Sequence, residues 1–278
     1  MNVQPPVERA YAYYLGQLDD FLLQSHNAHD FAEYLASRHE KLNEDQPLQQ
    51  DQVNTWVAEV LALRKLLKEQ RGDLIIALEA TVGHTNGRAD ILLCGTNSED
   101  AFCYDVIEAK GWHTARRNTL PSIPSVYDRR RYDIDVDHRE DMEKGVRLNL
   151  RRYTDGDNRR VFSVTSRDVP DPRNQVWGYR TLLDATLSSA CPDGSPVIDA
   201  SVLMYNQRSV RLDLRETLEN DIKADVLKAV PIYTRNRSGG SRSFTQLQRH
   251  LAARYDGDNG DNGKAYNHLF LALQKGSE

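Results

Sequence analysis

Three charged residues occur in a pattern that could hydrolyse a phosphodiester bond. Asp90 stands at the start of one apolar run, and Glu108 and Lys110 stand two residues apart at the end of the next. Side chains alternate along a strand, so Glu108 and Lys110 should point to the same face. Phosphodiester hydrolysis needs carboxylates that hold Mg²⁺, a source of hydroxide, and a cation that balances charge on the phosphate. The three residues therefore predict a magnesium site in which Lys110 orients the attacking water.

The same residues also have a purely structural interpretation. A Glu-x-Lys pair on a strand is most often a surface ion pair, and an Asp that begins a strand is most often a turn or cap residue. Their joint placement favours chemistry, because VIEAK ends a strongly apolar strand and Glu108 lies where the pattern changes from core to surface.

The predicted order of elements can bring these residues together. Three strands follow one another too closely for crossover helices, so they should form an antiparallel meander. Asp90 opens the second of these strands and Glu108 lies near the end of the third, so both carboxylates should converge at one end of the sheet. The apolar patterns predict a helix, three strands, a helix and a strand over residues 51–70, 74–80, 89–94, 101–109, 174–188 and 198–205.

This α-β-β-β-α-β order is the core order of the restriction-endonuclease fold. We therefore expect an α/β (α+β) protein with a mixed central sheet flanked by helices. The core should span 51–206, with a charged insertion at about 114–160 and helical extensions over 1–50 and 207–278. Within the extensions, the patterns predict helices over 6–23 and 213–228, a short strand near Ile232, and two helices after it.

Three short motifs give the order of elements a more specific meaning. Gly87-Arg88-Ala89-Asp90 resembles the GxxD motif of RecB-like nucleases of the PD-(D/E)xK superfamily, and Glu108-Ala109-Lys110 resembles their ExK motif. Gln175-Val176-Trp177-Gly178-Tyr179 resembles their QxxxY motif, on the helix after the third strand. The motifs occur in the family's order on the expected elements.

The resemblance implies a role for each matching residue. Asp90 and Glu108 would bind metal with help from the Ala109 carbonyl, and Lys110 would serve catalysis. Gln175 and Tyr179 would support the site, and their spacing of four places them on one helix face. Such enzymes often take a further ligand from the helix before the strands, which makes Glu59 an accessory candidate. Glu79, on the first strand, is a second accessory candidate for the same Mg²⁺ or Mn²⁺.

A closer resemblance points to a partner. Gln52, Trp56 and Glu59, followed by RAD, EAKGW, NQVWGY and VLMYN, resemble bacterial proteins in which such a nuclease precedes a Schlafen-like P-loop ATPase. GDNGDNGK at 257–264 does not supply that ATPase, because the spacing and the residue after Lys264 do not fit a phosphate-binding loop. A separate ATPase or helicase partner is therefore expected, with 207–278 as a docking region. The alternative is a self-sufficient enzyme whose C-terminal helices cover the sheet. A homo-oligomer is a further assembly that the chain could form.

Charge and composition set the remaining expectations. The net charge of −5 gives no general affinity for nucleic acid, but basic residues gather locally. No signal peptide, membrane-spanning run or CxxC spacing is visible, so we expect a cytoplasmic protein with no membrane association. The basic residues expected to hold the nucleic-acid backbone are Arg116, Arg117, Arg129, Arg130 and Arg131.

Together these features predict a Mg²⁺-dependent nuclease acting on DNA, and the resemblance suggests a setting in phage defence or DNA processing. Two alternatives stay open. One is an RNase with the same site, since phosphate chemistry differs little between DNA and RNA. The other is a non-catalytic, nuclease-like subunit that binds nucleic acid within an ATPase complex.

Overall fold

A mixed sheet of seven strands forms the centre of the molecule, which we describe from a computed structural model. The strand order is β1-β2-β3-β4-β7-β8-β9, antiparallel from β1 to β4 and parallel from β4 to β9. The structure describes residues 11–43, 48, 52–70, 74–82, 88–111, 150–154, 160–164, 172–190, 196–205, 229–235, 242–257 and 262–275. The sheet consists of β1 (Tyr14–Gln17), β2 (Ile75–Thr81), β3 (Arg88–Thr96), β4 (Phe102–Ala109), β7 (Val197–Met204), β8 (Ile232–Thr234) and β9 (Arg242–Ser243).

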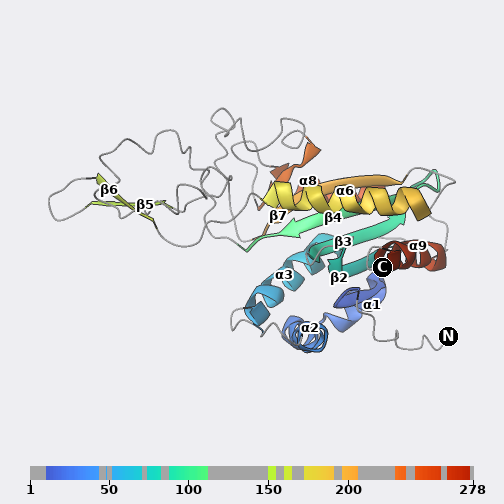
Figure 1. The fold of residues 1–278 in the computed structure, drawn as a ribbon, viewed down its shortest axis with the longest axis horizontal. Coiled ribbons are helices and arrows are strands. Elements are labelled where there is room, and N and C mark those ends of the chain that lie inside the picture. Colours follow the sequence, from blue (N-terminus) through green and yellow to red (C-terminus); the bar gives the residue numbers. More distant parts are fainter. Residues whose placement is uncertain are drawn as a thin grey trace.

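Helices cover both faces of this sheet (Figure 1). Apolar side chains of one face pack against four helices, and those of the other face pack against two. The first group is α1 (Leu18–Gln24), α2 (Ala28–Leu42), α3 (Gln52–Leu67) and α8 (Phe244–Arg254). The second group is α6 (Pro172–Ala190) and α9 (Asn262–Lys275).

The alternation of side chains explains why the sheet has two cores. On β3, Leu92 and Cys94 face α6 and α9, whereas Ile91 and Leu93 face α3. All four side chains are fully buried, as expected for a central strand with helices on both sides. Each helix contributes one apolar stripe; on α3 the buried positions recur every three or four residues from Trp56 to Leu67.

The structure confirms the α/β class with a mixed sheet flanked by helices. It corrects the helix expected over 6–23, because Tyr14–Gln17 is strand β1, paired with β2, and the helix begins only at Leu18. The aromatic spacing that suggested a longer helix instead places Tyr14 between the sheet and α2, where its ring contacts Phe31. The helix expected over 213–228 lies outside the described residues.

The remaining segments fall within the expected insertion and extensions. The expected insertion contains β5 (Leu150–Thr154), which pairs antiparallel with β6 (Arg160–Val164), a strand that begins where the insertion was expected to end. In the C-terminal extension, α8 contacts α3, β8 and β9, while α9 contacts β2, β3 and α6. No helix among the described residues combines the length and apolar character needed to cross a membrane.

Candidate active site

Asp90, Glu108 and Lys110 meet where β3 and β4 lie side by side. The Asp90 carboxylate accepts a hydrogen bond of 2.8 Å from the Ala109 backbone N–H. The Lys110 ammonium contacts the Glu108 carboxylate and lies 3.6 Å from that of Asp90. Lys110 also donates its backbone N–H to the Leu203 carbonyl at 2.8 Å, which extends the pairing of β4 with β7. The structure therefore brings the three predicted residues to one place.

Glu59 and Glu79 belong to the same group of charges. Glu59 lies on the buried stripe of α3 and is only 8% exposed. Glu79 comes from β2, and one of its carboxylate oxygens accepts a hydrogen bond of 2.8 Å from the indole N–H of Trp56. Both side chains interact electrostatically with Asp90 and Lys110. We call Glu59, Glu79, Asp90 and Glu108 the carboxylate cluster.

The backbone at Glu79 directs its side chain toward this cluster. Glu79 has φ of 51°, a left-handed conformation that is uncommon outside glycine and costs about 1–3 kcal/mol. Leu78 pairs with Ile91 and Ala80 pairs with Ala89, so no residue is inserted at this point. However, Ala77 and Ala80 both face α6 and α9, which shows that the alternation of side chains shifts at Glu79. The shift allows Glu79 to reach Trp56, whose helix lies on the opposite face.

Burial raises the pKa of every carboxyl group in the cluster, and repulsion between the acids raises those of Glu59, Glu79 and Glu108 further. Burial, followed by the charge of Asp90, raises the pKa of Glu108 to about 8 and that of Glu79 to about 7. The same two causes raise the pKa of Glu59, and burial raises that of Asp90 against the opposing effect of Lys110. Burial would lower the pKa of Lys110, but Asp90 and Glu108 raise it above its usual value. The cluster therefore carries more acid than its one lysine can balance.

This excess of acid fits a divalent cation. Oxygen Oε2 of Glu108 is buried and has no hydrogen-bond partner among the described residues. An unsatisfied carboxylate oxygen is costly in a protein interior, and carboxylates are the ligands that Mg²⁺ and Mn²⁺ prefer. No three of these carboxylates have oxygens within 4.8 Å of one another, so a shared ion would draw them closer. Glu59, Glu79, Asp90 and Glu108 are the residues able to hold it.

Gln175 and Tyr179 lie beside the cluster on α6. The Gln175 amide donates to the Tyr179 hydroxyl at 3.3 Å, in agreement with their predicted common face. Burial raises the pKa of Tyr179, and the charges of Glu108, Asp90 and Lys110 also act on its hydroxyl group. The pair thus stands on the face of the sheet to which β4 presents Glu108.

Several neighbours of the site carry roles that the sequence patterns did not predict. Trp56 holds the Glu79 carboxylate through a hydrogen bond. Tyr205, the residue after β7, interacts electrostatically with Glu59 and Asp90. Arg88 donates to the Glu79 carbonyl at 3.1 Å, and its guanidinium lies over the ring of Tyr13. Arg88 stands within the GRAD motif and Tyr205 within VLMYN, so both lie in segments that carry the resemblance, although neither was given a role; Tyr13 shows no comparable signal.

Part of the predicted site lies outside the described residues. This applies to the basic residues expected to hold nucleic acid, Arg116, Arg117, Arg129, Arg130 and Arg131. The metal contact expected of the Ala109 carbonyl also stays a prediction, although the N–H of the same residue holds Asp90.

A second charged group ties α8 to the sheet on the other side of β4. Asp105 lies three residues before Glu108 on the same strand, so its side chain points to the opposite face. The Arg254 guanidinium lies 2.8 Å from Asp105 and 3.0 Å from Asp199, and it also donates to the Tyr104 and Val197 carbonyls. His250 lies 3.3 Å from Asp199 and 3.6 Å from Asp105. We call Asp105, Asp199, His250 and Arg254 the ion network.

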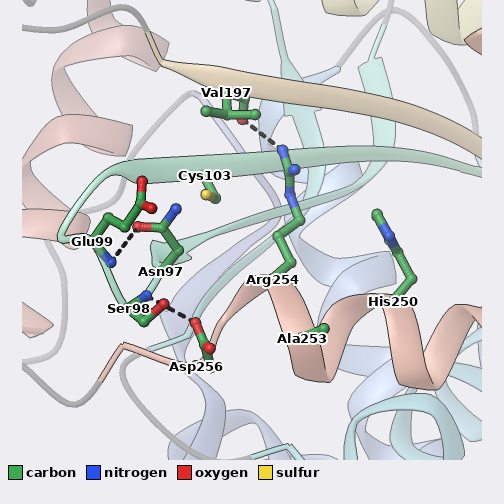
Figure 2. A pocket seen from close by; sticks show the side chains of 9 residues that line it. All are labelled: Asn97, Ser98, Glu99, Cys103, Val197, His250, Ala253, Arg254 and Asp256. Carbon is green, nitrogen blue, oxygen red and sulfur yellow. Dashed lines mark hydrogen bonds between the residues drawn. The ribbon is translucent and has the colours of Figure 1, made fainter.

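The ligand atoms of Asp105, Asp199 and His250 lie within 4.8 Å of one another, so this group could hold a metal ion. Figure 2 shows His250 and Arg254 reaching from α8 toward the strands, beside a surface pocket of about 320 Å³. In contrast to the carboxylate cluster, both acids here already have basic partners. Hydrogen bonding to His250 lowers the pKa of Asp199, and the hydrogen bonds to Asp105 and Asp199 raise that of His250 to about 9.

Comparisons of the chain with protein-family models, with curated proteins and with solved structures find no match. The interpretation of the site therefore depends on its residues and their geometry.

Proposed function

We propose that this chain is a metal-dependent phosphodiesterase that cleaves DNA, with a restriction-endonuclease-like core. One observation carries the proposal: four carboxylates, of which Glu59 and Glu108 are buried and Glu79 and Asp90 half-buried, converge beside a single lysine, and one oxygen of Glu108 has no partner among the described residues. Buried acids with raised pKa values occur preferentially at functional sites. A cluster of carboxylates that outnumbers the neighbouring cations, with a lysine beside it, is suited to bind Mg²⁺ or Mn²⁺ next to a phosphate.

Each residue of the site then has a defined task. Asp90 and Glu108 hold the cation, and Glu59, Glu79 and the Ala109 carbonyl are its further ligands. The bound ion supplies a water of lowered pKa and polarises the phosphate. The Lys110 ammonium, which contacts Glu108 and lies 3.6 Å from Asp90, would orient the attacking water and offset charge on the phosphate.

Support for this site comes from both faces of the sheet. Gln175 and Tyr179 approach from α6, where Gln175 holds the Tyr179 hydroxyl in the electrostatic field of Glu108, Asp90 and Lys110. Trp56 approaches from α3 and keeps Glu79 in place. These contacts hold the ligands before any ion arrives, which lowers the cost of organising the site.

The nucleic acid and a partner complete the proposal. Arg116, Arg117, Arg129, Arg130 and Arg131 contact the phosphate backbone, which positions the substrate without reading its sequence. The resemblance to nuclease domains that precede a Schlafen-like ATPase suggests an ATPase or helicase partner that docks on 207–278, in phage defence or DNA processing.

A substrate panel tests this function. Labelled single- and double-stranded DNA and RNA are incubated with wild-type protein in Mg²⁺, Mn²⁺ or EDTA, beside a Glu108→Gln variant. We expect DNA cleavage in Mg²⁺ or Mn²⁺, and none with EDTA or with Glu108→Gln. Preferential cleavage of RNA would indicate the RNase alternative. Binding of either nucleic acid without metal-dependent cleavage would indicate a non-catalytic subunit and overturn the proposal.

A further inference from the structure

Arg88 is a second cation beside the carboxylate cluster, on the side away from Glu108. It begins β3 two residues before Asp90 and lies against Glu79, whereas Lys110 lies against Asp90 and Glu108. Its side chain is half-buried, so the guanidinium is held by the protein but not sealed from solvent. The two basic groups therefore contact different members of the cluster, Arg88 at Glu79 and Lys110 at Asp90 and Glu108.

The contacts that fix the position of Arg88 include no ion pair with a described carboxylate, although its charge lowers the pKa of Glu79. The Nη1 group of Arg88 donates to the Glu79 carbonyl at 3.1 Å, and the guanidinium carbon lies 4.6 Å from the centre of the Tyr13 ring. Among the described residues, no carboxylate lies within the 4.0 Å of an ion pair with Arg88. A guanidinium has five N–H donors, and the Glu79 carbonyl engages one of them. Donors and positive charge thus remain for an anion.

Tyr13, the surface under Arg88, is itself held firmly. Its hydroxyl shares a hydrogen bond of 2.8 Å with His39 and accepts another of 2.8 Å from Asn43. Its ring also meets the edge of Trp56 at 5.9 Å between centroids, and Trp56 in turn holds Glu79. The N-terminal segment therefore orients Arg88 in advance, which reduces the entropy lost when the arginine binds a ligand.

We infer that Arg88 binds a phosphate of the nucleic acid next to the phosphate that is cleaved. The inference rests on the proposed function, and it adds a residue that sets how the strand lies across the carboxylates. An arginine held on an aromatic ring is suited to a phosphate, because its planar donors match two oxygens at once. A flanking phosphate also needs a cation here, since the cluster would otherwise repel it.

The test removes the charge of one phosphate at a time. A labelled oligonucleotide series, each with one neutral methylphosphonate near the cleavage site, is bound to wild-type protein and to Arg88→Gln. Ca²⁺ replaces Mg²⁺ because it accepts the same oxygen ligands with looser geometry. At one position we expect the neutral linkage to weaken wild-type binding about tenfold but to weaken Arg88→Gln binding less than twofold. Equal losses in both proteins at every position would overturn the inference.

Arg180 is a matched control elsewhere on the sheet. Its guanidinium also lies over an aromatic ring, 4.8 Å from the centre of Trp177, and it donates to a backbone carbonyl, that of Ile198, at 3.0 Å. Ile198 is near the start of β7, whereas the carboxylate cluster lies beside the end of that strand. Arg180→Gln should keep the wild-type pattern of methylphosphonate losses. Loss of the same position-specific effect in Arg180→Gln would also overturn the inference.

Two further comparisons separate folding and the proposed function from this inference. If Arg88→Gln fails to fold, Arg88→Lys serves, because it keeps the charge but loses the planar donors; the position-specific loss should then fall to about threefold. Cleavage in Mg²⁺, with no linkage whose neutralisation matters less in Arg88→Gln than in wild type, would overturn the inference and support the proposed nuclease function. An Arg88-dependent position without any cleavage would show that Arg88 contacts a phosphate, but it would overturn the nuclease and, with it, the position next to a cleaved phosphate. Absence of binding by wild-type protein would overturn both.

Discussion

The carboxylate cluster and the ion network stand on the same strand and balance their charges in opposite ways. Asp105 and Glu108 are three residues apart on β4 and both are almost fully buried. In the ion network, two aspartates face one arginine and one histidine. In the carboxylate cluster, four acids lie around one lysine, and counting Arg88 beside Glu79 they still outnumber the cations by two. The first arrangement neutralises itself, and the second does not.

We interpret this difference as separating a stabilising role for the ion network from the function proposed for the carboxylate cluster. A buried acid with basic partners fixes the position of a helix, whereas a buried excess of acid lowers stability and persists where a ligand uses it. The pKa values follow the same division, since hydrogen bonding to His250 lowers the pKa of Asp199 while burial raises those of Glu79 and Glu108. Substitutions in each group can break or sharpen this distinction.

The largest effect is expected for catalysis at the carboxylate cluster. Lys110→Ala or Asp90→Ala should lower kcat for metal-dependent cleavage by about 10³-fold, because each removes a group that acts on the reacting phosphate or on the ion. Circular dichroism should show an intact fold. Asp105→Asn is the control from the ion network and should keep the activity of the protein that remains folded. Wild-type activity in Lys110→Ala would contradict the division.

A large effect on stability is expected at the ion network. Arg254→Ala should lower the free energy of unfolding by about 3 kcal/mol, because it leaves the buried Asp105 without its closest cation. Urea unfolding would measure this change. Arg249, one turn away on α8, provides the control, and Arg249→Ala should change stability by less than about 0.5 kcal/mol. Equal effects of the two substitutions would show that the network does not hold α8.

The carboxylate cluster could be predicted from the sequence further than the ion network. Asp90, Glu108 and Lys110 lie at the ends of short apolar strands, so local alternation and turn spacing were sufficient to bring them together. Glu59 lies on the apolar stripe of α3, where an acidic residue is rare unless it pairs with another group or binds a ligand. Asp105 and Arg254 are 149 positions apart, and nothing local in either segment indicates the partner.

Backbone features set the other limit on prediction. The left-handed conformation at Glu79 has no signal in the sequence, because glycine or asparagine is the usual residue there. Strand β1 was mistaken for helix, since Tyr11, Tyr14, Leu15 and Leu18 follow helical spacing while pairing with β2 decides the outcome. Both features matter to the site: Glu79 belongs to the cluster, and the segment before β1 carries Tyr13 under Arg88.

A smaller effect on stability, opposite in sign to that of Arg254→Ala, is expected at Glu59. Glu59→Gln should raise the free energy of unfolding in EDTA by about 1 kcal/mol, because it removes a buried charge that Asp90 and Glu79 repel. The same change should reduce the stabilisation that Mg²⁺ gives, as ligand binding adds to stability only through the sites that remain. Thermal unfolding with EDTA and with Mg²⁺ measures both. Glu33→Gln, at an exposed position on α2, should change neither. Destabilisation by Glu59→Gln in EDTA would mean that the cluster is balanced after all.

The smallest effect concerns the pH dependence of the ion network. His250 hydrogen-bonds to Asp105 on β4 and to Asp199 on β7. These bonds raise the pKa of His250 to about 9, from about 6.5 in an unfolded chain. A raised histidine pKa adds stability that is fully present below about pH 6.5 and is lost as the pH rises through 9.

Wild-type protein should therefore lose stability relative to His250→Gln between pH 6.5 and 9.5, and the Tm difference between them should shrink by about 1–2 °C. The change is small because His250 is partly exposed and Arg254 still neutralises both aspartates. The difference between the two proteins is the quantity to measure, since the raised pKa values of Glu79 and Glu108 give both proteins the same further loss at high pH. His29→Gln, at an exposed site on α2, should follow wild type throughout. If the Tm difference between wild type and His250→Gln stays constant across this range, the histidine is not protonated by the network, and Arg254 alone balances its acids.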